Sequence, residues 1–289
     1  MTITICVCGA GTMGSGIAQV AAQSGFNTIL FDVNKPAVEK AKLLVEKNLH
    51  YLVTKEKISF AEEKEIYKRI QFTSDIKECS GEIIIEAIVE AEEAKVSLFN
   101  GLAKYNNEEV IFATNTSSLS ISSLQEKIIF PERVVGMHFF NPAYVMKLVE
   151  VVNGRLTNDE ISKTIYDICR QMGKIPVMCK DAPGFIVNRI ARHYYLESLK
   201  IVEDDIASIE DVDSILESSG FKMGPFKLMD LIGMDVNLAV SQSIYNAFDN
   251  AERFKPSELQ IEKVTKGELG QKTGKGFYNY SNPKNDLLS

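Results

Sequence analysis

Residues 3–14 read ITICVCGAGTMG, and this stretch decides the fold. Its first half, Ile3–Cys8, is β-branched and cysteine-rich, which predicts a buried strand. The second half fits the pattern G-x-G-x-x-G with Gly9, Ala10, Gly11, Thr12, Met13 and Gly14. A helix is expected over Met13–Gln23, and the next strand, Thr28–Phe31, ends at Asp32. A glycine turn in this context predicts a dinucleotide-binding unit.

The chemistry of dinucleotide binding explains each residue type in this unit. Gly9 permits the tight turn, Gly11 lets a pyrophosphate approach the backbone, and Gly14 lets the helix pack on the strand. The helix N-terminus adds free N–H groups and a partial positive charge. Asp32 can accept hydrogen bonds from ribose hydroxyls and would repel a 2′-phosphate, which favours NAD over NADP, although Lys35 nearby opposes this. The alternatives are a turn without a ligand, or FAD as the dinucleotide.

The composition excludes several classes of protein. The chain has 289 residues, a formal net charge of -7 and 45% hydrophobic residues, so a large core is expected and a nucleic-acid partner is not. No apolar stretch approaches the ~18 residues that span a bilayer, and no basic residue precedes Lys35, which argues against a membrane or targeting segment. Five scattered cysteines and three histidines indicate no disulfide framework and no metal site, and they suit the cytoplasm.

The remaining pattern gives the domain organisation. A charged helical hairpin is expected between about Pro36 and Arg69. Further strands are expected at Ile83–Ile88, Val110–Ala113 and Ile175–Cys179, and the pattern is helical from Pro183 onwards. The expected fold is α/β, with a Rossmann-like, mainly parallel sheet and a helical hairpin insertion in residues 1–181. A second, all-α domain is expected in residues 182–289.

Two β-rich runs, Val134–Phe140 and Lys147–Val152, flank the residues NPAY and predict an antiparallel hairpin. If the turn is centred on Tyr144, His138 and Glu150 pair across the strands, with Cβ atoms roughly 5 Å apart. A carboxylate there can hold one imidazole nitrogen and stabilise the charged ring, as a general base requires. The alternatives are a core histidine and a solvated glutamate.

Further segments complete a resemblance to a known family. Asn115–Ser118 follows the Val110–Ala113 strand, at the sheet edge where ligands bind in open α/β folds. The chain also contains GAGTMGSGIAQVAA, EAIVE, NTSSLSI, GMHFFNPAYVMKLVEVV, KDAPGFIVNRI, MGPFKLMD and KTGKGFY. Over nearly its whole length it resembles the L-3-hydroxyacyl-CoA dehydrogenases of the short-chain, 3-hydroxybutyryl-CoA type.

This resemblance implies an enzyme that transfers a hydride between NAD and C3 of a short-chain 3-hydroxyacyl-CoA. His138 would be the general base and Glu150 its orienting partner, while Ser117 and Asn188 would bind the reacting oxygen and the thioester region. The cofactor cleft would also be lined by Glu90, Lys95, Asn115, Ser117, Asn141 and Lys272. In the helical hairpin, Lys55 and Asn48 would contact coenzyme A, with Asn48 standing where some relatives have serine. The helical domain would form the interface of a homodimer.

Two other functions stay open on the sequence. The same chemistry can serve a longer or dicarboxylic acyl-CoA, or a free polyol acid such as gulonate, although Lys55 and the basic hairpin favour a coenzyme A ester. A nucleotide-binding structural protein without turnover is the alternative from another class. The intact His138 and Glu150 argue against it, because stability alone does not require a buried ion pair.

Overall fold

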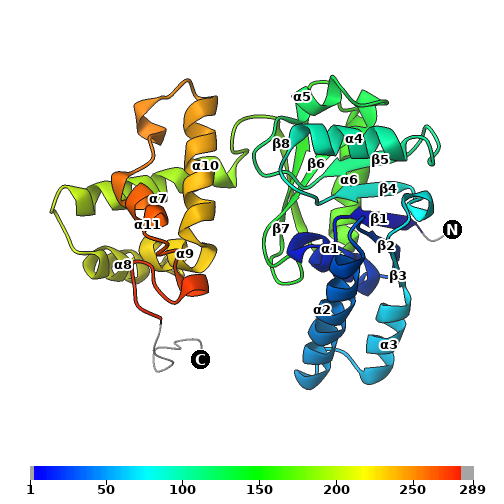
Figure 1. The fold of residues 1–289 in the computed structure, drawn as a ribbon, viewed down its shortest axis with the longest axis horizontal. Coiled ribbons are helices and arrows are strands. Elements are labelled where there is room, and N and C mark those ends of the chain that lie inside the picture. The colour runs from blue at the N-terminus through cyan, green and yellow to red at the C-terminus, as the bar shows by residue number, and fades with distance from the viewer. Residues whose placement is uncertain (1–2, 281–289) are drawn as a thin grey trace. The chain divides into compact units, whose positions relative to one another are not determined.

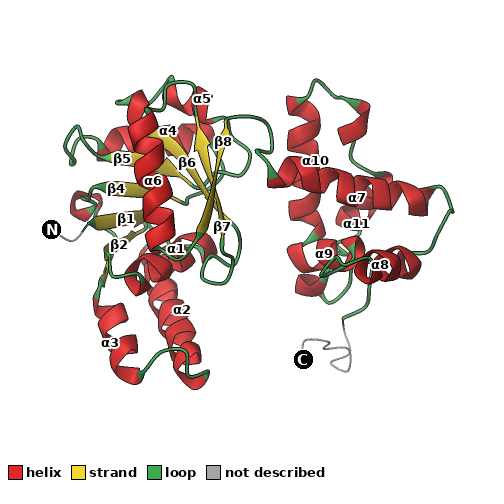
Figure 2. Cartoon of the chain, turned by 180° about the vertical axis from the view of Figure 1, so that it is seen from behind, coloured by secondary structure: helices red, strands yellow, loops and turns green. Residues whose placement is uncertain are grey.

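The computed structural model describes residues 3–280 (Figure 1). The chain forms two compact units that divide between Phe185 and Ile186, a few residues beyond the boundary expected from the sequence. The first unit contains every strand of the sheet and the second is helical, as Figure 2 shows. The expected α/β class with a separate helical part is therefore confirmed.

The first unit is built on an eight-stranded sheet with the order β3-β2-β1-β4-β5-β6-β7-β8. Neighbouring strands are parallel except β6 and β7, which are antiparallel. The strands are β1 (Thr4–Cys8), β2 (Asn27–Phe31), β3 (Ile70–Thr73), β4 (Ile83–Glu86), β5 (Ile111–Thr114), β6 (Val134–Phe139), β7 (Leu148–Asn153) and β8 (Ile175–Lys180). From β1 the chain continues outward to β2 and β3, and then returns to place β4 on the other side of β1. The order therefore reverses between β1 and β4, and ligands bind at such a point.

Helices cover both faces of the sheet. On one face Ile5 and Val7 pack with side chains of α1 (Thr12–Gln23), α2 (Lys35–Thr54) and α6 (Asp159–Gln171). On the other face Cys6 and Cys8 pack with side chains of α4 (Glu92–Leu102) and α5 (Ile121–Gln125). The alternation along β1 follows from the two-residue period of a strand, and it places both fully buried cysteines on one face.

The expected helical hairpin consists of α2 and α3 (Phe60–Lys68), which extend away from the sheet (Figure 1). A capping box starts α3, because the Ser59 side chain accepts from the Glu62 N–H and Glu62 accepts from the Ser59 N–H. The strand that follows, β3, was not foreseen from the sequence. Ile70–Thr73 becomes a strand because it pairs in parallel with β2.

The second unit packs five α-helices around its own core. They are α7 (Val187–Glu203), α8 (Ile209–Ser218), α9 (Pro225–Ile232), α10 (Met234–Ala247) and α11 (Glu258–Thr265). The core includes Leu199, Phe226 and Met229. Buried Asp230 accepts hydrogen bonds from the Phe277 and Tyr278 N–H groups, so the KTGKGFY segment packs onto α9 as a turn. Within residues 3–280 no helix has the length and apolar character of a membrane span.

Candidate active site

The glycine turn between β1 and α1 is shaped by close backbone contacts. Gly9 has φ +106°, a left-handed conformation that favours glycine, and its N–H donates to the Phe31 carbonyl. A Cβ built on Gly14 would lie 1.7 Å from the Gly9 carbonyl oxygen, so no side chain fits there. A Cβ on Gly11 would meet nothing within 4 Å. The turn is therefore tight at Gly9 and Gly14 and open to a ligand at Gly11.

This turn fits the phosphates of a dinucleotide. Helix α1 begins after Gly11 without any side-chain cap, so its first N–H groups are available to an anion. Asp32, at the end of β2, accepts the Ala10 N–H through Oδ2 (2.8 Å) and the Asn34 N–H through Oδ1 (2.9 Å). These bonds fix the carboxylate beside the turn, where ribose hydroxyls of a bound nucleotide would lie.

A buried ion-pair network lies at the carboxyl ends of β4 and β5. Glu86 ends β4, is fully buried, and pairs with Lys95 on α4 at 2.7 Å. The Lys95 ammonium also pairs with Glu90 at 3.1 Å. Burial raises the pKa of Glu86 in spite of Lys95. Burial alone would also raise the pKa of Glu90, but Lys95 and hydroxyl hydrogen bonds outweigh it, so this pKa is lowered.

Glu90 shapes the loop that carries Ser117. Its Oε1 accepts the Thr116 hydroxyl, the Ser117 N–H (3.0 Å), and both the N–H and hydroxyl of Ser118. The Ser117 hydroxyl has no hydrogen-bond partner in the described part of the chain. The network thus fixes the backbone of Ser117 and leaves its side chain available to a ligand.

The antiparallel pair β6 and β7 positions the imidazole. His138 and Glu150 are register partners across these strands, which confirms the pairing expected from the sequence. His138 Nδ1 lies 2.7 Å from Glu150 Oε2, and both side chains are buried. The rings of Phe140 and Phe185 lie 4.6 Å and 5.8 Å from the imidazole, centroid to centroid. His138 Nε2 has no partner among residues 3–280, so one nitrogen is held and the other is available.

Further contacts connect this strand pair to its neighbours. The Asn115 side chain, after β5, accepts the Phe139 N–H at 2.8 Å. Ala143, in the turn between β6 and β7, packs on α1, since a Cβ built on Gly16 would lie 3.2 Å from the Ala143 Cβ. Buried Lys174 donates to the carbonyls of Ala143 and Met146 and so fixes the same turn. Asn141 begins this turn and is exposed.

The predicted coenzyme A contacts both lie on the helical hairpin, seven residues apart. Asn48 donates to the Gln19 side chain of α1 at 3.1 Å, which attaches the hairpin to the nucleotide helix. Lys55 follows the end of α2, is exposed, and its ammonium lies 5.6 Å from the centre of the Tyr51 ring. Lys55 therefore presents a cation on the surface of the hairpin.

Two predicted site residues belong to the second unit. Asn188 lies in the first turn of α7 and is partly buried. Lys272 pairs with Asp235 at the start of α10 and is exposed. The structure groups the remaining predicted residues in the first unit, around the glycine turn, the ends of β4 to β6 and the hairpin.

The sequence reasoning missed Glu86 and Thr116, which hold the Lys95 and Glu90 side chains. A signal for Glu86 was present, because this glutamate ends the otherwise apolar run Ile83–Ile85 and a carboxylate buried in that way needs a partner. Nothing local marked Thr116. Among residues 3–280 no cluster of histidine, cysteine or acidic side chains is suited to a metal ion.

The first unit combines a glycine turn suited to a dinucleotide with an imidazole that a carboxylate holds in place. Nicotinamide-dependent dehydrogenases have this arrangement. Two family models cover the chain: the NAD-binding domain of 3-hydroxyacyl-CoA dehydrogenase matches residues 4–182, and the C-terminal domain matches residues 184–280. The chain belongs to this family of NAD-dependent 3-hydroxyacyl-CoA dehydrogenases, and its cofactor is NAD.

Individual relatives agree with this assignment. A 3-hydroxyadipyl-CoA dehydrogenase of Escherichia coli is 43% identical over 96% of this chain, which spans only 59% of that relative's length. A 3-hydroxybutyryl-CoA dehydrogenase of Clostridioides difficile is 39% identical over 96% of this chain and 99% of its own. The solved structure of an (S)-3-hydroxybutyryl-CoA dehydrogenase from Ralstonia eutropha superposes with a TM-score of 0.93, at 37% identity, over 98% of this chain and 100% of its own.

Proposed function

We propose that this protein interconverts short-chain L-3-hydroxyacyl-CoA and 3-oxoacyl-CoA thioesters, with 3-hydroxybutyryl-CoA and acetoacetyl-CoA as the representative pair. The observation that carries the proposal is the buried His138–Glu150 contact of 2.7 Å, in the same unit as the nucleotide turn. Relatives of nearly the same length are named 3-hydroxybutyryl-CoA dehydrogenases, which supports the short acyl chain.

The proposed mechanism assigns the proton to His138. With Nδ1–H donated to Glu150, Nε2 carries the free lone pair and can take the proton from the 3-hydroxyl group. When bound, NAD⁺ would supply the acceptor for the hydride of C3, and the hydroxyl proton would move to Nε2 as the alcohol becomes a ketone. Glu150 then stabilises the imidazolium, which later releases its proton to solvent. The flanking Phe140 and Phe185 rings limit water around this step.

The other predicted site residues receive binding roles. Ser117 and Asn188 would bind the reacting oxygen and the thioester region. The glycine turn and Asp32 would hold the pyrophosphate and ribose of NAD, with Asn115, Asn141 and Lys272 also lining the cofactor site. Glu90 and Lys95 would act mainly by fixing the Ser117 loop, since their charges already satisfy each other. Lys55 and Asn48 would contact coenzyme A.

The test is the loss of NADH absorbance when acetoacetyl-CoA is added to the purified protein. We expect rapid oxidation of NADH with the thioester, and little with free acetoacetate or with NADPH. No turnover of the thioester, with NADH bound, would contradict the proposed substrate. Equal turnover of free acetoacetate would contradict the coenzyme A contacts.

A second substrate is favoured by a specific observation. The relative that is 43% identical is named a 3-hydroxyadipyl-CoA dehydrogenase, so a dicarboxylic 3-hydroxyacyl-CoA is the second candidate. The same assay with 3-hydroxyadipyl-CoA and NAD⁺ compares the two candidates directly through their kcat/KM values.

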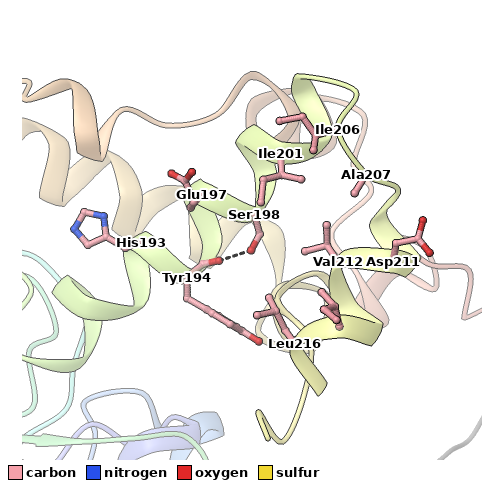
Figure 3. A pocket seen from close by; sticks show the side chains of 11 residues that line it. His193, Tyr194, Glu197, Ser198, Ile201, Ile206, Ala207, Asp211, Val212 and Leu216 are labelled. Atoms are coloured by element: carbon pink, nitrogen blue, oxygen red, sulfur yellow. Dashed lines mark hydrogen bonds between the residues drawn. The ribbon is translucent and has the colours of Figure 1, made fainter. Parts of the chain in front are cut away.

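We also propose that the enzyme is a homodimer formed through its second unit. A groove of about 520 Å³ lies between α7 and α8, and its lining is mainly apolar (Figure 3). Ile206 and Ile215 on its border are 71% and 66% exposed, so together with the groove they form a continuous apolar surface. A second copy of the chain would bury them.

The cytoplasm is the proposed location, supported by five cysteines that are all free thiols. Fractionation of the source cells would test it, and recovery of the protein with an oxidising compartment would contradict it.

A further inference from the structure

A buried lysine that the proposed mechanism does not use joins α6 to β8. Helix α6 ends in a Schellman motif, in which Gly173 has φ +68° and the Lys174 N–H donates to the Cys169 carbonyl at 2.9 Å. Among residues 3–280 no carboxylate pairs with the Lys174 ammonium, and burial lowers the pKa of this lysine. A buried cation that is held only by neutral groups is costly. Stability alone therefore does not explain a lysine at this joint.

The Lys174 ammonium holds the two arms of the turn between β6 and β7. It donates to the Ala143 carbonyl and, at 2.8 Å, to the Met146 carbonyl. Ala143 lies on the arm that follows His138, and Met146 lies on the arm that leads to Glu150. One cation therefore bridges the two arms of the turn that connects the imidazole with its carboxylate partner.

The same turn is packed on the nucleotide helix from its other side. A Cβ built on Gly16 of α1 would lie 3.2 Å from the Ala143 Cβ, so the turn and the helix are already in close contact. The turn begins at Asn141, which the proposed function places at the cofactor. Lys174 thus holds the turn in place between α1 and the joint of α6 with β8, and a shift of the turn would move Asn141 and the end of β6 together.

We propose that Lys174 is a positioning residue for the transfer at C3, because it fixes the turn that sets how His138 and Asn141 face the bound reactants. This inference rests on the proposed function. Lys174 donates to backbone carbonyls and transfers no proton in the reaction. An ammonium suits this role, since a single nitrogen can donate to more than one carbonyl. A displacement of about 1 Å at the reacting groups can cost on the order of 10²-fold in rate.

The test is the substitution Lys174→Met, which removes the ammonium and keeps an unbranched side chain. Protein in excess over NADH is mixed with saturating acetoacetyl-CoA in a stopped-flow instrument, and the single turnover of NADH is followed. Deuterium at the transferred C4 position of NADH should slow this step, which identifies it as the hydride transfer. We expect the rate constant to fall roughly 10- to 100-fold in Lys174→Met. A merely structural role would lower the amplitude of the signal, through the loss of folded protein, and would leave the rate constant unchanged.

Two further variants separate position from charge and from folding. Lys174→Arg keeps a cation with several N–H donors and should stay within about fivefold of the wild-type rate constant. Gly16→Ala presses a methyl group on Ala143 with Lys174 intact, so it displaces the same turn from the side of α1 and should also slow the step. Gly16→Ala decides the question if Lys174→Met does not fold.

The matched control is Lys163→Met, which makes the same change at an exposed position on α6 and should leave the rate constant unaltered. A wild-type rate constant in folded Lys174→Met would overturn the positioning role and leave the proposed function standing. An equal fall in Lys163→Met would also overturn it. If the wild-type protein does not oxidise NADH with the thioester, the proposed function fails, and the role of Lys174 fails with it.

Discussion

At the scale of single residues, His138 combines two properties that a general base needs. Its Nδ1 is held by Glu150, so the ring cannot rotate and Nε2 keeps its lone pair. Its surroundings are apolar, so few water molecules compete for that nitrogen. Asp32, in the proposed nucleotide site, is also held in one orientation, because its two oxygens accept backbone N–H groups.

The substitution His138→Gln is expected to lower kcat by roughly 10²- to 10⁴-fold, the usual contribution of general acid–base catalysis. Affinity for NADH, measured by fluorescence titration, should stay within about twofold, since the imidazole does not belong to the nucleotide turn. A variant with normal turnover would remove His138 from the proposed mechanism.

The substitution Asp32→Asn tests the choice of cofactor. An amide oxygen can still accept the Ala10 N–H, while the Asn34 N–H loses its acceptor, so the negative charge is removed at the expense of one of the two backbone hydrogen bonds. The ratio of kcat/KM with NADPH to that with NADH should rise at least about tenfold, because a 2′-phosphate no longer meets a like charge. An unaltered ratio would show that Asp32 does not face the ribose.

At the scale of elements, two glycines of the turn have different roles, since Gly14 is required for packing and Gly11 for the proposed binding of NADH. Gly14→Ala forces a methyl group against the Gly9 carbonyl, so α1 must shift away from β1. We expect a loss of about 1–3 kcal/mol in the free energy of unfolding, measured by urea titration. Gly11→Ala should unfold like the wild type, since its methyl group meets no protein atom, but should bind NADH more weakly. Equal NADH affinity in Gly11→Ala and the wild type would contradict the proposed position of the pyrophosphate.

The network at the ends of β4 and β5 predicts a pH dependence. Lys95→Met removes the cation beside fully buried Glu86, which should lower the free energy of unfolding by about 3–5 kcal/mol at pH 7. Because the pKa of Glu86 is raised in the folded state, the native protein binds a proton more tightly than the unfolded chain, and stability falls as pH rises through that range. The loss should therefore be smaller at about pH 5 than at pH 7.

Denaturant titrations at the two pH values measure this difference. Lys104→Met, an exposed lysine just beyond α4, is the control and should change stability little at either pH. A Lys95→Met protein whose stability loss is the same at both pH values would contradict the role given to Glu86.

Elements were predictable from the sequence where local pattern and tertiary structure agree. The apolar runs of β1, β4 and β6 and the symmetric hairpin around Tyr144 indicated the sheet and the pairing of His138 with Glu150. The strand β3 was missed because it is four residues long and follows a charged helix directly, and only pairing with β2 defines it.

At the scale of the whole molecule, the two units have separate cores and separate roles. The first unit holds the nucleotide turn and the imidazole, and the second holds Asn188 and the apolar groove between α7 and α8. The proposed dimer concerns the second unit alone, so dimer formation and NADH binding should be separable by mutation.

The proposed dimer is tested by Ile215→Asp on the border of the groove. Light scattering after size exclusion should give about twice the chain mass of 32.2 kDa for the wild type and a smaller value for the variant. Ile175→Asp on β8, an isoleucine that is 59% exposed in the first unit, is the matched control and should leave the mass unchanged. A wild-type protein that runs as a monomer at all concentrations would contradict the proposed dimer.

The close packing of Gly16 on Ala143 joins the nucleotide helix to the turn that leads from His138 to Glu150. The start of α1 and the strand pair that carries the imidazole therefore belong to one packed unit. The separation between the cofactor and the base is then set once, during folding, and does not have to be re-established in each catalytic cycle. The distance over which hydride and proton depart would then stay constant.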